Sequence, residues 1–115
     1  MNKSLVTIIT PSYNCSKFIS DTVNSVLSQS YSNWEMIIVD DCSTDNSVEI
    51  IERITGDNPK IKLIKLENNV GSAQSRNAAL EVASGRFIAF LDSDDIWYTD
   101  KLEKQVEFML KRKAP

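Results

Sequence analysis

Apolar residues occur along this chain in two patterns, short continuous runs and longer amphipathic stretches, and the two patterns alternate. The runs are rich in β-branched residues, which is typical of strands buried on both faces of a parallel sheet. They predict strands at residues 5–10, 34–39, 61–66 and 87–91. The amphipathic stretches predict helices at about 16–28, after 43–46, at about 72–83 and at 98–111.

Turn and capping residues set the expected limits of these segments. Pro11 is expected to end the first strand, because proline lacks the N–H of a central strand. Asp45, within the polar stretch 43–46, is expected to cap the second helix, and Gly56 to close it. Gly85 is expected at the C′ position of the third helix. The apolar face expected for the first helix consists of Phe18, Ile19, Val23, Val26 and Leu27.

Alternating strands and helices with short connections predict right-handed crossovers and a parallel sheet. The expected fold class is therefore α/β, a three-layer α/β/α arrangement with a mainly parallel sheet. The third strand alternates partly between apolar and polar residues, which indicates a less buried position. The 115 residues predict a single domain, and the last helix directly before Pro115 suggests a truncated chain.

Composition narrows the functional classes. A net charge of −3 and an acidic pI of 4.9 argue against nucleic acid as a partner, because no basic surplus is available to neutralise phosphates. No apolar stretch approaches the roughly 20 residues that span a bilayer, and no signal peptide is expected. Cys15 and Cys42 predict reduced thiols in a cytoplasmic protein. Histidine is absent, which removes the usual general base.

Acidic residues follow two of the predicted strands at the point where each strand ends. They are Asp40, Asp41, Asp45, Asp92, Asp94 and Asp95. Parallel strands place their carboxyl ends at one edge of the sheet, where ligands bind. Acids from two strands repel one another there unless a cation lies between them, so Mg²⁺ or Mn²⁺ with a phosphorylated ligand is expected. Helix capping is the alternative, and it accounts for Asp45 and for Asp95 or Asp100.

Two further side chains have candidate roles at this edge. Arg76 lies near the start of the third helix, where the helix dipole disfavours a cation unless an anion also binds. The alternative for Arg76 is a surface ion pair with an acid of a neighbouring loop. Tyr13 follows the first strand, where its ring is placed either to stack on a base or sugar or to lie partly buried in a turn.

Motifs of other nucleotide-binding and signalling proteins are missing. Neither G-x-G-x-x-G nor G-x-x-x-x-G-K-[ST] occurs, so phosphate binding must rely on metal and side chains. A receiver-like signalling module, which also gathers acids around Mg²⁺, is an alternative, although here the paired acids follow the second strand and not the first. A nucleotidyltransferase is a further alternative, but it needs a glycine-rich basic loop after the first strand, and residues 10–17 contain no glycine.

Five segments together resemble the family 2 glycosyltransferases of the GT-A fold. They are Val6-Thr7-Ile8-Ile9-Thr10-Pro11-Ser12-Tyr13-Asn14, Ser25-Val26-Leu27-Ser28-Gln29-Ser30-Tyr31, Ile38-Val39-Asp40-Asp41-Cys42-Ser43-Thr44-Asp45, Asn69-Val70-Gly71 with Ser75-Arg76-Asn77-Ala78-Ala79, and Phe90-Leu91-Asp92-Ser93-Asp94-Asp95. Each motif alone is weak, but five in the right order over nearly the whole chain are specific.

The resemblance implies a nucleotide-diphosphate sugar as donor, with a UDP-sugar expected. The implied substrate-binding residues are Thr10, Pro11, Tyr13, Asp41, Arg76, Asp92 and Asp94. Asp41 matches the residue that reads the base edge, and Arg76 a pocket arginine near base and phosphates. Asp92-Ser93-Asp94 matches the D-x-D element, in which Asp92 faces the ribose and both acids serve Mn²⁺ or Mg²⁺.

The resemblance also implies a hexosyltransferase-like reaction that transfers the sugar with inversion to a hydroxyl of an acceptor saccharide or lipid-linked sugar, in cell-surface polysaccharide synthesis. The catalytic base of such enzymes comes from a later segment, expected beyond Pro115, and Asp95 and Glu103 match no such position. The chain is thus expected to be a donor-binding portion without activity alone. The full-length protein is expected peripherally at the inner membrane face, and the exposed sheet edge of this portion invites self-association.

Overall fold

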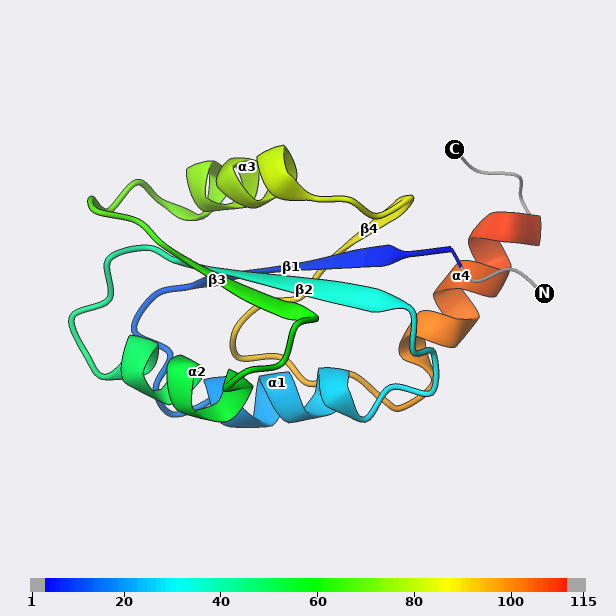
Figure 1. Cartoon of the computed structure of the whole chain (residues 1–115), viewed down its shortest axis with the longest axis horizontal. Coiled ribbons are helices and arrows are strands. Elements are labelled where there is room, and N and C mark those ends of the chain that lie inside the picture. Colours follow the sequence, from blue (N-terminus) through cyan, green and yellow to red (C-terminus); the bar gives the residue numbers. More distant parts are fainter. Residues whose placement is uncertain (1–3, 112–115) are drawn as a thin grey trace.

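The computed structural model describes residues 4–111, in which four strands alternate with four helices (Figure 1). In chain order the elements are β1 (Val6–Ser12), α1 (Ile19–Leu27), β2 (Trp34–Asp40), α2 (Ser47–Thr55), β3 (Ile61–Lys65), α3 (Ser72–Val82), β4 (Phe87–Phe90) and α4 (Lys101–Lys111). No helix among the described residues is long and apolar enough to cross a membrane.

The four strands form one parallel sheet in the order β3-β2-β1-β4. Helix α3 covers one face of this sheet, whereas α1 and α2 cover the other (Figure 1). The predicted three-layer α/β/α arrangement with a mainly parallel sheet is confirmed. β3 is an edge strand whose residues are half-buried or exposed, as its partial alternation indicated.

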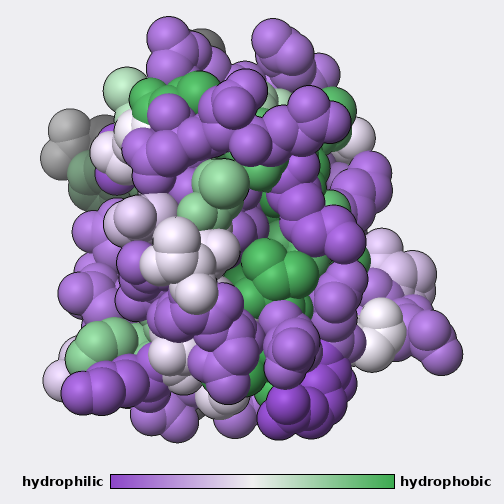
Figure 2. All heavy atoms as spheres, turned by 90° about the vertical axis from the view of Figure 1, so that its left-hand side faces the viewer, coloured by the Kyte–Doolittle hydropathy of each residue, from purple (hydrophilic) through white to green (hydrophobic). Residues whose placement is uncertain are grey.

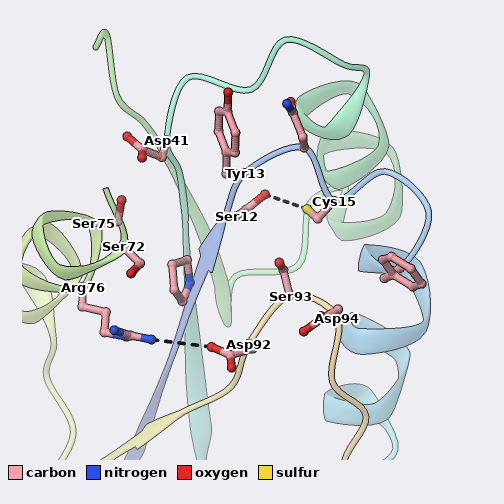
Figure 3. A pocket seen from close by; sticks show the side chains of 13 residues that line it. Ser12, Tyr13, Cys15, Asp41, Ser72, Ser75, Arg76, Asp92, Ser93 and Asp94 are labelled. Atoms are coloured by element: carbon pink, nitrogen blue, oxygen red, sulfur yellow. Dashed lines mark hydrogen bonds and ion pairs between the residues drawn. The ribbon is translucent and has the colours of Figure 1, made fainter. Parts of the chain in front are cut away.

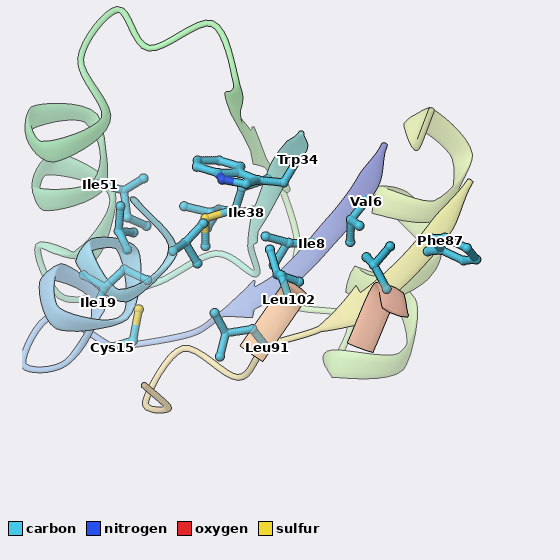
Figure 4. Close-up of a cluster of buried hydrophobic side chains, with 14 residues drawn as sticks. Val6, Ile8, Cys15, Ile19, Trp34, Ile38, Ile51, Phe87, Leu91 and Leu102 are labelled. Atoms are coloured by element: carbon cyan, nitrogen blue, oxygen red, sulfur yellow. The ribbon is translucent and has the colours of Figure 1, made fainter. Parts of the chain in front are cut away.

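Side chains that alternate along β1 and β2 divide the core into two clusters. Val6 and Ile8 belong to the larger cluster, between the sheet and α1, α2 and α4, which Leu91 and Leu102 complete (Figure 4). Ile9 belongs to a smaller cluster under α3. The other buried members of this smaller cluster are Ile37, Val39 and Ala79.

Strand β1 continues through Pro11 to Ser12, so the expectation that Pro11 ends it was wrong. The N–H of Leu91 donates to the carbonyl of Ile9, so Ile9 bonds toward β4, and Pro11 faces the same side two residues later. Because β4 ends at Phe90, no partner strand lies beside Pro11 on that side. The missing N–H therefore costs no ladder hydrogen bond.

The first and last helices begin later than their amphipathic patterns predicted, at Ile19 and at Lys101. Phe18 is the N-cap of α1 and is about half exposed, and Leu27 at the other end is also exposed. The apolar face of α1 is therefore narrower than expected. It consists of Ile19, Val23 and Val26, spaced four and three residues apart.

Gly85 is not the C′ residue of the third helix, because α3 already ends at Val82 with Ala83 as its C-cap. Its N–H donates to the hydroxyl of Thr7, and a Cβ at this position would lie 2.5 Å from the Thr7 backbone nitrogen. Gly85 thus permits a close approach of the chain to β1. Gly56 does close α2, with the positive φ of 49° that favours glycine.

Candidate functional site

A cavity of about 480 Å³ opens at the carboxyl edge of the sheet. Its lining comprises Pro11, Ser12, Tyr13, Asn14, Cys15, Phe18, Asp41, Ser72, Ser75, Arg76, Asp92, Ser93 and Asp94. The face of the molecule at this edge is mainly hydrophilic (Figure 2). The lining comes from the end of β1, from the loops after β1, β2 and β4, and from the first turns of α3 (Figure 3).

Six of the seven substrate-binding residues predicted from the sequence line this cavity. They are Pro11, Tyr13, Asp41, Arg76, Asp92 and Asp94. The structure does not bring Thr10 to the cavity. Its side chain lies on the same face of β1 as Ile8, in the interior, because strand side chains alternate. The hydroxyl of Thr10 is buried without a hydrogen-bond partner among the described residues.

Asp41 is almost buried although it belongs to the lining, and its carboxylate is bound by the chain just before α3. Oδ1 accepts a hydrogen bond from the N–H of Val70 at 2.7 Å, and Oδ2 one from the N–H of Gly71 at 2.8 Å. Asp41 therefore anchors the start of the helix that carries Arg76. Each carboxylate oxygen keeps a second lone pair for a ligand.

Arg76 reaches across the cavity toward the loop after β4 (Figure 3). Its Nη2 lies 3.6 Å from Oδ1 of Asp92. Both side chains are partly exposed, at 37% and 59%. The surface ion pair considered as the alternative for Arg76 is therefore present, but the acid in it lines the same cavity. A ligand anion would have to share or replace this pair.

Carboxylates gather in the loop after β4. Asp92, Asp94 and Asp95 each offer an oxygen, and these atoms lie within 4.8 Å of one another. Exposed carboxylate oxygens are hard ligands of the kind that Mg²⁺ and Mn²⁺ bind, so this donor set fits the expected ion. Capping of the last helix by Asp95 or Asp100 was the alternative. α4 begins at Lys101, directly after Asp100, whereas Asp95 belongs to this cluster. Asp92 and Asp94 lie across the cavity from Asp41 (Figure 3).

Tyr13 is held by its neighbour Asn14, which joins the loops after β1 and β2. Asn14 has a φ of 49°, in the left-handed region that asparagine tolerates better than most residues. Its Oδ1 accepts a hydrogen bond from the N–H of Thr44 at 2.8 Å, and its own N–H donates to the hydroxyl of Ser43. Tyr13 is half exposed at the cavity, with its hydroxyl pointing away from Asp92 (Figure 3).

The remaining acids after β2 serve the loops themselves. Asp40 is buried and accepts hydrogen bonds from Ser12 and Ser43. Asp45 accepts from the N–H groups of Ser47, the first residue of α2, and of Ser16. Slight desolvation acts to raise the pKa of Asp45, but the hydrogen bond from the Ser47 hydroxyl and those from the two N–H groups outweigh it and hold this pKa below its usual value. The capping alternative thus applies to Asp45, although Asn46 is the formal N-cap.

Several lining residues were not singled out from the sequence as ligand-binding. They are Ser12, Asn14, Cys15, Phe18, Ser72, Ser75 and Ser93. Ser72 and Ser75 lie one turn apart on α3, so their three-residue spacing next to Arg76 was an available signal. Cys15 is a buried free thiol 2.8 Å from the hydroxyl of Ser12, and Cys42 is free and exposed.

Comparison with known proteins assigns this arrangement to a class. Residues 7–114 match the family described as glycosyl transferase family 2, and the chain belongs to this family. The resemblance inferred from the five motifs is thereby confirmed, and the family membership decides against the receiver-like and nucleotidyltransferase alternatives.

Two curated relatives are more than 50% identical to the chain. The putative teichuronic acid biosynthesis glycosyltransferase TuaG of Bacillus subtilis (strain 168) is 57% identical over 110 residues, which cover 96% of this chain and 44% of TuaG. The UDP-Glc:alpha-D-GlcNAc-diphosphoundecaprenol beta-1,3-glucosyltransferase WfgD of Escherichia coli is 51% identical, over 96% of this chain and 43% of WfgD. The chain thus spans less than half the length of these relatives.

Solved structures agree with the GT-A fold. S. aureus TarS 1-349 in complex with UDP matches with a TM-score of 0.84 and 35% identity, over 92% of this chain and 32% of the TarS 1-349 chain. The mannosyltransferase PcManGT from Pyrobaculum calidifontis, in complex with GDP-Man and Mn²⁺, matches with a TM-score of 0.85 and 28% identity, over 90% of this chain and 32% of PcManGT.

Proposed function

We propose that this chain is the donor-binding portion of an inverting, metal-assisted glycosyltransferase that uses a nucleotide-diphosphate sugar, with a UDP-sugar as the expected donor. The transferase would act in cell-surface polysaccharide synthesis. One observation carries the proposal. Asp41, Arg76, Asp92 and Asp94, from three different loops and helices, line a single cavity at the carboxyl edge of the sheet.

The two sides of this cavity suit the two ends of a nucleotide diphosphate. Tyr13 offers a partly exposed ring for a base or sugar, and Asp41 offers carboxylate lone pairs to base N–H groups. Across the cavity, Arg76 supplies a cation for phosphate oxygens. The carboxylates of Asp92 and Asp94 on the same side would repel the diphosphate. This side of the cavity therefore suits a diphosphate only when a divalent cation is also bound.

Asp92 and Asp94 would hold Mn²⁺ or Mg²⁺, and Asp95 lies close enough to assist. When bound, the ion offsets the charge that builds up on the departing diphosphate. The carboxylates fix the position of that positive charge, and Arg76 adds a second one beside Asp92. Arg76 would thereby stabilise the leaving group, where charge develops during transfer.

The relatives support the donor and the type of acceptor. WfgD is named for UDP-Glc and for a diphosphoundecaprenol-linked sugar, and TuaG for teichuronic acid biosynthesis. TarS has been solved with UDP, and PcManGT with GDP-Man and Mn²⁺. A saccharide or lipid-linked sugar is accordingly the proposed acceptor. The proposed location of the full-length enzyme is the inner face of the membrane.

The catalytic base and the acceptor site are proposed to come from sequence beyond this portion. No residue of the chain is assigned as base, and this portion alone is expected to bind donor without transferring sugar. Inversion is part of the proposal and rests on the family resemblance.

Calorimetric titration of UDP into the protein, with and without Mn²⁺, tests the donor site. UDP should bind measurably only with Mn²⁺, and Asp94→Asn should weaken this binding at least about tenfold, since it removes a charged ligand worth more than about 1.4 kcal/mol. The exposed Asp57, which lies outside the cavity, provides the matched control Asp57→Asn.

Equal binding with and without Mn²⁺ would contradict the metal-assisted part of the proposal. Absence of UDP binding both in this chain and in a longer chain of the same protein would overturn the donor site as a whole. GDP, titrated in the same way, distinguishes a pocket that reads uracil from one that reads only the diphosphate.

A further inference from the structure

A row of buried polar side chains runs along one side of α1 and just past its end. Thr22, Ser25 and Gln29 are 0%, 8% and 8% exposed. Their spacing of three and four residues places them on one side of a helix. Buried hydroxyl and amide groups cost free energy unless they are hydrogen-bonded, so the partners of this row matter.

Thr22 contacts the acidic loop after β4. Its Oγ1 lies 2.9 Å from the carbonyl oxygen of Ser93 and 2.7 Å from that of Asp95. The two carbonyls bracket Asp94. Ser25 contacts the next part of the same segment, because its Oγ accepts a hydrogen bond from the N–H of Trp97 at 3.2 Å.

Gln29 continues these contacts to the start of α4. Its Nε2 donates to the carbonyl of Tyr98 at 2.6 Å, and its Oε1 accepts from the N–H of Leu102 at 3.0 Å. The amide thus satisfies a first-turn N–H of α4, as a capping side chain would. Beside it, the N–H of Ser30 donates to the carbonyl of Thr99.

All of these hydrogen bonds reach backbone atoms of residues 93–102, so they fix the path of this segment without occupying its side chains. The part before α4 contains neither helix nor strand. Two turns occur here, in which the Asp95 N–H donates to the Asp92 carbonyl and the Lys101 N–H to the Tyr98 carbonyl. Figure 1 shows the segment passing beside α1 on its way to α4. None of these hydrogen bonds uses the carboxylate of Asp94, which lines the cavity.

We propose that Thr22, Ser25 and Gln29 are positioning residues for the acidic loop. They hold the backbone on both sides of Asp94, and thereby the Asp92 and Asp94 carboxylates, in place before any ligand binds. The functional part of this inference rests on the proposed donor site, whereas its structural part stands on the hydrogen bonds alone. Pre-organised ligands lose less conformational freedom when they bind, so the row should tighten metal and diphosphate binding.

Thr22→Val tests the proposal, because valine keeps the shape and removes the hydroxyl. Thr22→Ser is the conservative variant that should restore it. Thr55 provides the matched control, since its hydroxyl donates to the carbonyl of Ile51 within α2, far from the acidic loop in sequence and outside the cavity lining. Ser25→Ala is a second variant of the row in case Thr22→Val does not fold.

Amide hydrogen exchange of the ligand-free protein is the first readout. In Thr22→Val the amides of Asp95 and Trp97 should exchange about tenfold faster or more, as expected for the loss of a buried hydrogen bond. Sheet amides such as that of Ile37 should change no more than in Thr55→Val. An unchanged rate at Asp95 and Trp97, or equal acceleration throughout the sheet, would overturn the positioning role.

Calorimetry with Mn²⁺ and UDP is the second readout. Thr22→Val should weaken binding about tenfold while Thr22→Ser and Thr55→Val bind as the unmodified chain does. Unchanged affinity together with faster local exchange would show that the row has no effect on binding, which refutes the functional part. If neither the unmodified chain nor a longer chain of the same protein binds UDP, the donor site fails, and the exchange rates still decide whether the row fixes the loop.

Discussion

Asp41 combines two tasks in one carboxylate. It lines the cavity, and its two oxygens receive the N–H groups of Val70 and Gly71 ahead of α3. Hydrogen bonds to an ionised acceptor are worth about 1.5–3 kcal/mol each, so the start of α3 is firmly fixed to the loop after β2. A residue that contacts a base here would also set the position of the helix that carries Arg76.

The ion pair of Arg76 and Asp92 lies at the cavity, where a ligand anion would have to share or replace it. Their ion pair, at 3.6 Å and partly exposed, is worth little on its own, about 0–1 kcal/mol. A metal ion held by Asp92, as proposed, would compete with the guanidinium for the same carboxylate. A diphosphate, in contrast, would be attracted by both the metal ion and the guanidinium of Arg76. Arg76 should therefore oppose the binding of metal alone and favour the binding of nucleotide.

Arg76→Met tests this opposition at a single residue. Without nucleotide, the variant should bind Mn²⁺ roughly two- to fivefold more tightly, because a weak competing ion pair is gone. With Mn²⁺ present, it should bind UDP about tenfold or more weakly, because charge-assisted hydrogen bonds to phosphate are lost. Calorimetric titration of each ligand measures both effects.

Arg86→Met is the control for the Arg76 variant, because Arg86 is an exposed arginine at the opposite end of the sheet, directly before β4. It should leave both affinities unchanged. If Arg76→Met weakened the binding of Mn²⁺ and of UDP alike, the arginine would be supporting the acidic loop and not competing with the metal.

At the scale of the elements, hydrophobic periodicity predicted all four strands and all four helices, because burial dictates where apolar residues recur. Boundaries failed where tertiary contacts decide them. Pro11 stays in β1 because β4 ends earlier, and Gly85 serves a close approach to Thr7 that no local signal reveals.

The same holds for the residues of the candidate site: some were predictable from the sequence pattern, and others depend on tertiary contacts. The common position of Asp41, Asp92 and Asp94 at one cavity was predictable, because parallel strands deliver their carboxyl ends to one edge of the sheet. The polar row of α1 was not predicted. Threonine and serine are common on exposed helix faces, so the residue types gave no sign of a buried role. The burial of Thr22 and Ser25 depends on a segment some 70 residues later in the chain. Sequence spacing within one helix carries no information about that partner.

The loops after β1 and β2 provide a pH-dependent prediction at the same scale. The pKa of Asp45 is lower in the folded protein than its ordinary value, because of hydrogen bonds from Ser47 and Ser16 that outweigh burial. Ionised Asp45 therefore stabilises the fold above the unfolded pKa of about 3.9, and this contribution is lost as the pH falls through the lower folded pKa. Asp45→Ala should cost about 1 kcal/mol near neutral pH, as for a lost cap.

Urea denaturation at several pH values measures this effect. The difference in unfolding free energy between the unmodified chain and Asp45→Ala should be constant above about pH 5 and shrink toward pH 3. Asp57→Ala, at an exposed aspartate outside these loops, should show no such difference. If the loss of unfolding free energy in Asp45→Ala stayed constant down to pH 3, the negative charge of Asp45 would not be what stabilises the fold.

At the scale of the whole molecule, the two edges of the sheet are protected unequally. β3 carries exposed Lys62 and Lys65 at one edge. β4 forms the other edge with the uncharged sequence Phe-Ile-Ala-Phe, and Phe90 at its end is 52% exposed. Leu80 and Val82 of α3, the helix that covers one face of the sheet, are also exposed. Charged residues on an edge discourage pairing with other chains, so β4 is the edge open to association.

We therefore expect this 115-residue chain to self-associate through β4 at high concentration, and Phe90→Lys to reduce it by placing a charge on the open edge. Sedimentation velocity over a range of concentrations measures the effect, and the dissociation constant should rise about tenfold or more, since a charge would have to be buried on pairing. Tyr98→Lys is the control, because Tyr98 is 86% exposed but lies outside the sheet. Equal loss of association in both variants would mean that exposed aromatic surface, and not the edge of β4, drives it.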